Sequence, residues 1–491
     1  MLFYNWWGGC FAILGALTGI LTAVTIILSK TVISLTLQTT LPLLSVYVRI
    51  DQLSAFFIFI ISLIALASSI YGLGYVKHYY KKYNLGALGF FYNLFLAGMV
   101  LVVSSSQVVF FLIVWEIMSL ASYFLVIFEH KENATLKAGS LYFVMTHVGT
   151  VFIIIALMLL YITTGSLDFQ AIKANITMVP PVLKTVVFLL ALIGFGTKAG
   201  IIPFHIWLLS AHPAAPSHVS ALMSGVMIKT GVYMLIRLTI DLMAPSPIWW
   251  GVIVLILGAI SSLLGVLYAL TEHDLKRLLA YHSIENIGII LLGVGSSLIF
   301  GALNLGSLAV LALTAALFHT LNHAIFKAVL FLGAGAVISQ THTRNIEDYG
   351  GLIKLMPITA FLFLIGSLAI SALPPFNGFF SEWVTFQAIF AGISGSAIAL
   401  RWVFIVGAGS LAFTGGLAAM CFVKAFGATF LARPRSEEVK RAKEVDNFLL
   451  AGMSLLAAAI FSWLTKKDLR TIRIIAITSA LGQLTLVLLS V

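Results

Sequence analysis

Charged residues are scarce in this chain of 491 residues: Asp, Glu, Lys and Arg together make up 9% of it. An ordinary soluble domain carries roughly 25% of these residues. Hydrophobic residues account for 61%, and they fall into successive runs of the length that crosses a bilayer, roughly 20 apolar residues each. The composition excludes a soluble enzyme and predicts an all-α, polytopic membrane protein.

Cysteine is nearly absent, with only Cys10 and Cys421 far apart in apolar surroundings. The sequence therefore has no disulfide framework and no CxxC pair for zinc or an iron–sulfur cluster. We expect no metal, no cofactor and no catalytic centre in this chain, so that any redox metal belongs to a partner protein.

Acidic residues are also few, at 17 against 28 Lys and Arg, which gives a net charge of +11. Basic connections on the cytoplasmic side of a membrane protein account for such an excess. We therefore expect the lipid bilayer, and not a nucleic acid, as the partner of this positive charge.

The apolar runs predict about fourteen membrane crossings. They lie near residues 6–29, 51–75, 86–103, 107–128, 134–162, 181–212, 217–238, 247–270, 278–298, 305–338, 357–395, 400–430, 447–464 and 472–490. Most Lys and Arg residues of the connections fall on one side of this map, which predicts a cytoplasmic N-terminus. The connection around 466–473 runs against this bias, so either that last hairpin lies flat at the cytoplasmic face or one boundary is misplaced.

Two of the predicted segments are too long and are interrupted. Segment 181–212 contains Gly200 and Pro203, and segment 357–395 contains Pro374 and Pro375. Such interruptions are tolerated at membrane depth only where the loose backbone faces protein or water, and paired broken segments are typical of inverted-repeat transporters. We predict two inverted five-helix repeats, each with a broken helix, and divide the chain into N-terminal helices 1–106, a first repeat 107–238, a second repeat 247–430 and C-terminal helices 431–491.

Six ionisable residues fall inside apolar segments, where one charge costs about 2.5–3.5 kcal/mol on insertion scales. They must therefore face one another or water. They are Glu116, Lys198, Lys229, Glu285, Lys327 and Glu382.

Glu116 and Lys198 suggest a proton switch, because Lys198 stands beside the first interruption. A nearby carboxylate keeps the ammonium charged, and separating the two favours release of the proton. The alternative for Glu116 is a neutral carboxylic acid that only holds neighbouring helices together.

A second group occupies one helix face. His319, His323 and Lys327 are spaced i, i+4, i+8, so they lie on a single stripe, and a stripe of histidines beside a lysine is typical of a proton relay. Structural hydrogen bonding is the alternative, and zinc is a third, although no acidic or cysteine partner stands at zinc-motif spacing. Lys229 is the next predicted proton station, or else a structural partner of a helix C-terminus.

Glu382 lies just past the second interruption, and Lys198 stands beside the first. We therefore predict that Glu382 is the exit site, where the proton is loaded or released. The alternative is that Glu382 only caps a helix end. His282 and Glu285 lie one helical turn apart and would bridge the two halves. Both are near a helix start, where they can contact water.

Three further residues are candidates for the relay. His205 and His212 lie along the first interruption, and each is as readily a structural histidine. Lys424 lies near a cytoplasmic helix end, where its side chain can reach the interface instead.

Four stretches carry a family resemblance: Trp115-Glu116, residues 197–208 (TKAGIIPFHIWL), residues 211–217 (AHPAAPS) and residues 323–328 (HAIFKA). They resemble the antiporter-like membrane subunits shared by respiratory complex I, Mrp-type Na+/H+ antiporters and membrane-bound hydrogenases. Within that superfamily, residues 217–225, 281–288, 373–379 and 422–427 are most similar to the antiporter-like membrane subunits of hydrogenase-4 and of formate hydrogenlyase.

The resemblance implies a membrane subunit that translocates protons, or sodium ions, within a [NiFe]-hydrogenase or formate hydrogenlyase-type complex of a prokaryotic cell (inner) membrane. The oxidoreductase chemistry, with its NiFe centre and iron–sulfur clusters, would belong to a peripheral hydrogenase arm that binds this and other membrane subunits. It also implies Glu116 and Lys198 as the switch, Lys229 and Lys327 as the central relay, and Glu382 as the terminal site.

Two other functions remain open from the sequence. One is a subunit of an Mrp-type multisubunit Na+/H+ antiporter, which works from an ion gradient without redox partners. The other is a membrane scaffold whose buried polar residues only hold helices together.

Overall fold

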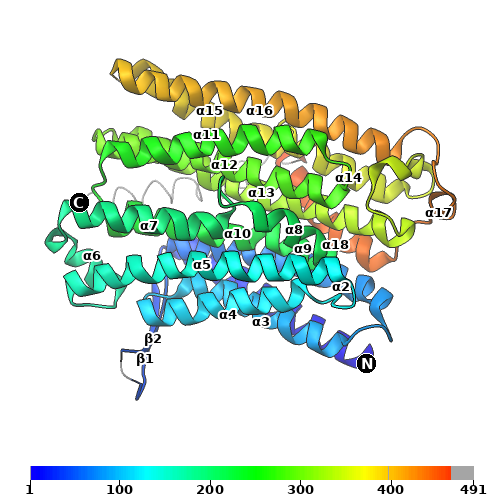
Figure 1. Cartoon of the computed structure of the whole chain (residues 1–491), viewed down its shortest axis with the longest axis horizontal. Helices are drawn as coiled ribbons and strands as arrows, with labels where there is room; N and C mark the ends of the chain where they lie inside the picture. Colours follow the sequence, from blue (N-terminus) through cyan, green and yellow to red (C-terminus); the bar gives the residue numbers. More distant parts are fainter. Residues whose placement is uncertain (1, 42, 396, 466–491) are drawn as a thin grey trace.

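The computed structural model describes residues 2–41, 43–395 and 397–465. Its helices run side by side along the long axis of the molecule, and their connections gather at two opposite ends (Figure 1). Eleven helices in this part of the chain are long and apolar enough to cross a membrane. The prediction of a polytopic helical bundle is confirmed. The total of about fourteen crossings stays a prediction, and the segment predicted at 472–490 lies outside the described residues.

The elements follow one another along the chain. The first part contains α1 (Leu2–Ser29), β1 (Ile33–Gln38), β2 (Ser45–Ile50), α2 (Gln52–Tyr75), η1 (Val76–Tyr79), α3 (Leu85–Ser104), α4 (Val108–Val126), α5 (Asn133–Thr164), α6 (Phe169–Ala174), η2 (Ile176–Met178) and α7 (Pro181–Ala199). The middle contains α8 (Ile206–Ala214), α9 (Ser217–Leu222), η3 (Met223–Met227), α10 (Ile228–Ile236), η4 (Arg237–Leu242), α11 (Ile248–Thr271), α12 (Leu275–Ala302) and α13 (Gly306–Thr341). The last part contains η5 (Ile346–Asp348), η6 (Leu352–Lys354), α14 (Pro357–Ile370), α15 (Asn377–Gly395), α16 (Ile398–Phe430), α17 (Glu437–Lys440) and α18 (Asn447–Thr465).

The two ends of the bundle differ. Strands β1 and β2 project from one end, and α17 and the start of α1 lie at the other (Figure 1); we call these the hairpin end and the α17 end. The strands pair antiparallel, with Ile33 opposite Ile50. Neither strand was predicted from the sequence, although Ile33–Gln38 alternates apolar and polar side chains as a half-exposed strand does.

Local sequence explains where the helices begin. Asn84, Gln107 and Asp274 each accept hydrogen bonds from backbone amides in the first turn of α3, α4 and α12, which satisfies donors that a helix start leaves free.

Both predicted interruptions are present. The first broken segment consists of α7 and α8, separated at Gly200, which has a left-handed φ of +78° that suits glycine. The second consists of α14 and α15, separated around Pro375. The region 107–238 holds α4, α5, the broken α7–α8 pair and the α9–η4 segment, so a five-helix repeat there would have to begin with α3. The inverted relation between the repeats stays a prediction.

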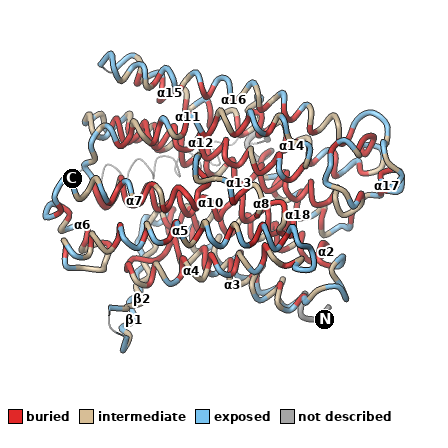
Figure 2. The backbone as a smooth tube through the Cα atoms, viewed as in Figure 1, coloured by how far each residue is buried: buried red, intermediate tan, exposed pale blue. Residues whose placement is uncertain are grey.

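The centre of the bundle is formed by the α9–η4 segment, α12 and α13, which are buried along nearly their whole length, whereas α1 and α16 are largely exposed (Figure 2). Helices α11 and α12 approach closely because glycines face each other: a Cβ at Gly258 would lie 2.8 Å from the backbone oxygen of Gly288. Since the central helices carry the predicted Lys229, His282, Glu285 and Lys327, these side chains lie away from lipid.

Candidate ion-translocation site

Lys198 is buried at the C-terminal end of α7, close to the first interruption at Gly200. Its Nζ donates hydrogen bonds to Oγ of Ser119 at 2.9 Å and to the hydroxyl of Tyr142 at 3.2 Å. The ammonium also lies 5.6 Å from the ring centroid of Trp115, within the range of a cation–π interaction. These neutral partners hold Lys198 without a direct ion pair.

Glu116 forms its ion-pair contact with a residue that the sequence reasoning missed. Its Oε2 lies 3.2 Å from Nε2 of His147 on α5, and the two side chains are 29% and 36% exposed, respectively. The structure therefore does not bring Glu116 into direct contact with Lys198. The predicted switch between those two residues stays a prediction and would require this interface to rearrange.

A backbone carbonyl orients the ring of His147. Its Nδ1 lies 2.8 Å from the carbonyl oxygen of Phe143, and because a carbonyl only accepts, Nδ1 is the donor in this contact. The other ring nitrogen, Nε2, is therefore the one that faces Oε2 of Glu116.

Lys229 is fully buried on α10, directly after the π-helical turn η3. Its Nζ donates to the backbone oxygen of Ser224, five residues earlier, at 2.7 Å. A π turn is wider than an α turn and is frequent at functional sites. The ammonium is thus held by a backbone carbonyl and not by a carboxylate.

Lys327, His323 and His212 form a buried group of unpaired nitrogen atoms. Nζ of Lys327 and both ring nitrogens of His323 and of His212 have no hydrogen-bond partner among the described residues. Lys327 interacts electrostatically with Lys229 on one side and with Glu285 on the other. Buried polar atoms almost always bind a protein group or water, so these nitrogens suit a hydrated path across the bundle.

His319 connects three helices. Its Nδ1 lies 3.0 Å from Oγ of Ser381 on α15, and its Nε2 lies 3.1 Å from Oδ1 of Asn286 on α12. Nδ1 of His282 contacts Oε2 of Glu285 within α12. The predicted residues of the second half therefore meet at the junction of α12, α13 and α15.

Glu382 is 7% exposed and lines a groove of about 520 Å³ between α15 and α16, together with Trp383, Phe379, Leu411 and Gly415. Apart from Glu382 and Ser371, the residues that line the groove are apolar. The carboxyl group of Glu382 is the last of the predicted ionisable groups, of which Glu116 is the first.

The remaining candidates contact helix ends. Nζ of Lys424 donates to the carbonyl oxygens of Leu270 and Glu272, both at 2.9 Å, which satisfies the C-terminus of α11 and favours the interfacial alternative. His205 is half-buried at the start of α8. Lys276 precedes the predicted segment 278–298, but it is buried, and its Nζ donates to the carbonyl oxygen of Ala215 at 2.8 Å.

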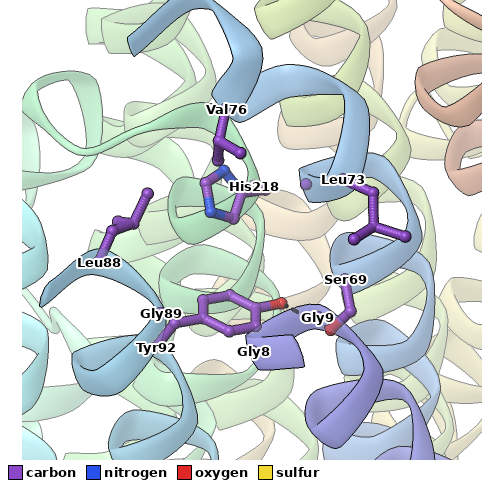
Figure 3. Close-up of a pocket in the computed structure, with 10 residues that line it drawn as sticks. Gly8, Gly9, Ser69, Leu73, Val76, Leu88, Gly89, Tyr92 and His218 are labelled. Atoms are coloured by element: carbon purple, nitrogen blue, oxygen red, sulfur yellow. Dashed lines mark hydrogen bonds between the residues drawn. The ribbon is translucent and has the colours of Figure 1, made fainter. Parts of the chain in front are cut away.

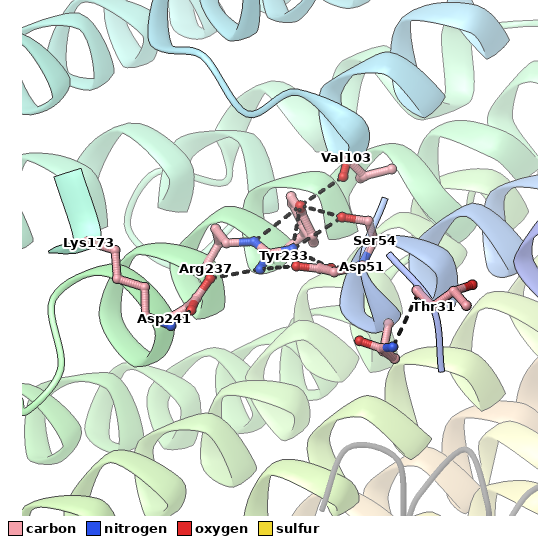
Figure 4. Close-up of polar contacts among 9 residues, drawn as sticks. Thr31, Asp51, Ser54, Val103, Lys173, Tyr233, Arg237 and Asp241 are labelled. Atoms are coloured by element: carbon pink, nitrogen blue, oxygen red, sulfur yellow. Dashed lines mark hydrogen bonds and ion pairs between the residues drawn. The ribbon is translucent and has the colours of Figure 1, made fainter. Parts of the chain in front are cut away.

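A cluster of ion pairs at the hairpin end surrounds Arg237, which stands at the end of the predicted segment 217–238. Arg237 is buried and donates to both carboxylate oxygens of Asp51, at 2.7 and 2.8 Å, and to Asp241 at 2.8 Å (Figure 4). Lys173 of α6 donates to Asp241 at 2.8 Å. These four residues, the Arg237 cluster, join α2, η4 and α6.

Within the ranges that the structure covers, no three His, Cys, Asp or Glu side chains come together in a way that could hold a metal ion.

Known proteins are similar to this chain in sequence and in fold. The chain is 49% identical over 427 residues to hydrogenase-4 component B of Escherichia coli, covering 85% of the chain and 63% of that protein. It is 40% identical over 420 residues to formate hydrogenlyase subunit 3 of Escherichia coli, covering 86% of the chain and 66% of that protein. The chain thus spans slightly less than two thirds of the length of these relatives.

A solved structure of the Mrp complex from a Dietzia species contains a chain with the same fold, with a TM-score of 0.78, 21% identity, and coverage of 97% of this chain and 92% of that one. Residues 105–409, more than half of the chain, match the family described as NADH:quinone oxidoreductase/Mrp antiporter, TM. This chain therefore belongs to the NADH:quinone oxidoreductase/Mrp antiporter family of transmembrane subunits.

Proposed function

We propose that this chain is the proton-translocating membrane subunit of a membrane-bound [NiFe]-hydrogenase or formate hydrogenlyase-type complex, with sodium as the alternative ion. One observation carries the proposal: Lys198, Lys229, Lys327, Glu382 and several histidines are buried inside the bundle, and the nitrogens of Lys327, His323 and His212 lack protein partners among the described residues. With Glu116, these side chains form the proposed row across the bundle. Buried ionisable groups cost free energy in a membrane protein, so a row of them indicates an ion path.

Each group in the row has a proposed role in proton transfer. The Glu116–His147 pair would store a proton at the lateral face. Lys198 holds a charge that aromatic rings and hydroxyls stabilise, and a movement at the first interruption would bring Glu116 towards it or away. Lys229, His212, His323 and Lys327 would pass the proton along the centre, because two ammonium charges within reach repel each other and favour transfer.

The second half would complete the transfer. His319 links the central helices to α15 through Ser381, while His282 and Glu285 share a contact beside it. Glu382 would take up or release the proton at the groove between α15 and α16.

The lateral position of Glu116 and His147 supports partner subunits. Polar side chains that are about a third exposed on membrane-spanning helices are unfavourable against lipid, so we expect another membrane subunit to cover them. The names of the two Escherichia coli relatives support a peripheral hydrogenase arm, which would hold the NiFe centre and iron–sulfur clusters. We propose a prokaryotic cell (inner) membrane, with the α17 end and the N-terminus on the cytoplasmic side, because more basic connections lie there.

Purification of the intact complex from native membranes tests this function. Mass spectrometry should identify hydrogenase subunits, elemental analysis should find nickel, and the complex in liposomes should move protons when an electron donor and acceptor turn over. Recovery of a complex without nickel and without redox-driven ion movement would contradict the proposal.

An Mrp-type antiporter subunit is the second candidate, and the shared fold with the Dietzia Mrp chain favours it. In that case a sodium gradient alone should drive proton movement in liposomes without any electron donor.

A further inference from the structure

A small cavity lies beside His218 towards the α17 end, apart from the row described above. Its volume is about 30 Å³, and residues of α1, α2, η1, α3 and α9 line it. The wall includes Gly8, Gly9, Ser69, Gly72, Gly89 and Tyr92 (Figure 3). Because four of these residues are glycines, the cavity exists where side chains are missing.

His218 is the basic side chain on this wall. It is only 3% exposed, and its Nδ1 has no hydrogen-bond partner within the described part of the chain. Its imidazole points into the space above Tyr92 (Figure 3). The ionisable groups that face it are the phenols of Tyr75 and Tyr92, with ring centroids at 5.8 and 5.4 Å, and, farther away, the Lys276 ammonium.

The size and polarity of the cavity determine which kind of molecule fits in it. A cavity needs roughly 10–15 Å³ to hold one water molecule, and water stays only where polar partners are present. His218 supplies an unpaired nitrogen, and the Tyr92 hydroxyl and Ser69 Oγ, 3.0 Å apart, supply two oxygens. The cavity therefore suits water and is too small for a lipid headgroup or an organic ligand.

A series of contacts leads from His218 towards α13, the helix that carries Lys327. The Tyr75 hydroxyl lies 3.2 Å from Oγ of Ser217, the residue before His218. The side chain of Ser217 packs against Gly335 of α13, where an added Cβ would lie 2.3 Å from it. Lys327 stands eight residues earlier on the same helix, at a distance of about 12 Å along its axis.

We propose that this cavity is a water-binding site at which protons from the α17 end reach His218 and enter the relay without passing the Glu116–Lys198 interface. The inference rests on the proposed ion-translocating function, since an entry site needs a relay to feed. It adds His218 and a glycine-lined water site to the groups already assigned.

Hydrogen–deuterium exchange at the imidazole Cε1 of individual histidines tests water access without relying on ion transport. The intact complex is placed in heavy water, and mass spectrometry follows His218 against His273, whose side chain is 62% exposed. We expect measurable exchange at His218. Absence of exchange there, while His273 exchanges fully, would overturn the proposal.

A cavity-filling variant and a matched control sharpen the test. A Cβ added at Gly89 meets no atom within 4 Å, and the same holds for Gly15, which does not line the cavity. Gly89→Leu should slow exchange at His218 several-fold and leave His273 unchanged, whereas Gly15→Leu should change neither. If Gly89→Leu fails to fold, Gly72→Ala serves, because its Cβ would sit 3.4 Å from Cδ2 of His218 in ordinary contact.

Proton uptake from the α17 side completes the experiment. His218→Asn and Gly89→Leu should both slow the initial rate of uptake in liposomes while dye-linked redox activity stays unchanged. Water access with an unchanged rate in His218→Asn would overturn the entry role. A wild-type complex that moves no ions at all would instead contradict the proposed function, and the exchange data would still show whether the cavity holds water.

Discussion

At the residue scale, the Glu116–His147 pair is the contact that most changes the interpretation of the site. Nδ1 of His147 lies 2.8 Å from the Phe143 carbonyl oxygen, and its Nε2 lies 3.2 Å from Oε2 of Glu116. Each of these ionisable side chains, which would be costly alone inside a membrane, therefore has the other as a neighbour.

Replacing His147 by Ala should strongly reduce redox-coupled proton translocation, because Glu116 would lose the side chain with which it forms its ion-pair contact. The infrared band of a buried carboxylic acid should change in the same variant, and dye-linked redox activity should stay at the wild-type level. His130→Ala is the matched control, since His130 also contacts a backbone carbonyl, that of Phe128, but lies in the α4–α5 connection. Equal translocation in both variants would remove His147 from the mechanism.

Sequence patterns located Lys198, Lys229, Lys327 and Glu382 because an ionisable residue in an apolar helix is conspicuous. His147 was missed because one histidine in α5 carries little signal alone. A comparison of depth could have found it, since α4 and α5 are antiparallel neighbours joined by a short connection, and Glu116 and His147 both lie near the middle of their helices.

At the element scale, the Arg237 cluster ties three segments together at the hairpin end. Asp51 precedes the span of α2. Burial alone would raise the pKa of its carboxyl group, but the Arg237 guanidinium outweighs burial and lowers this pKa from 3.8 to about 2. A carboxyl group with a lowered pKa contributes stability that is fully present above its unfolded value and is lost as the pH falls through its folded value.

The free energy of unfolding of the purified protein should therefore fall by about 2 kcal/mol as the pH drops from about 4 to about 2. Asp51→Asn should be less stable at neutral pH and should lack this pH-dependent loss, as measured by denaturant unfolding. Asp446→Asn is the control, because the Lys77–Asp446 pair is 47% and 38% exposed and such surface pairs contribute little. If stability depended on pH in Asp51→Asn in the same way as in the wild type, the stabilising role of the Asp51–Arg237 ion pair would be contradicted.

The α11–α12 contact gives a second prediction at this scale. A Cβ at residue 258 would lie 2.8 Å from the Gly288 oxygen and 2.9 Å from the Leu292 nitrogen, so Gly258→Leu must push two backbones apart. We expect a loss of about 1–3 kcal/mol, as overpacking usually costs, seen as a lower melting temperature. Gly301→Leu in α12 is the control and should leave the melting temperature unchanged, because its Cβ meets nothing within 4 Å. An equal loss of stability in both variants would show that the close approach of α11 and α12 is not essential.

The interruptions were predictable because glycine and proline disrupt helices in a recognisable way. The β1–β2 hairpin was not predicted, because its short alternating runs lie between apolar segments that dominate the hydropathy pattern. The two five-helix repeats and the boundary at residue 107 stay predictions.

At the scale of the whole molecule, the composition determined the fold class: a chain with 9% charged residues can bury its apolar helices only in a membrane. The same scarcity made the row from Glu116 to Glu382 visible. The sequence could not show which groups touch, because Lys198 finds Ser119 and Tyr142, and Arg237 finds Asp51, through folding that joins distant segments.

The most direct test of the account is redox-driven proton movement in liposomes that contain the intact complex with Lys327→Ala. Lys327 is fully buried at the centre of the row and has no hydrogen-bond partner for its Nζ among the described residues. We predict that this variant loses proton movement and keeps dye-linked redox activity, while the control Lys137→Ala, an exposed position in α5, keeps both. Proton movement at the wild-type rate in Lys327→Ala would contradict the account.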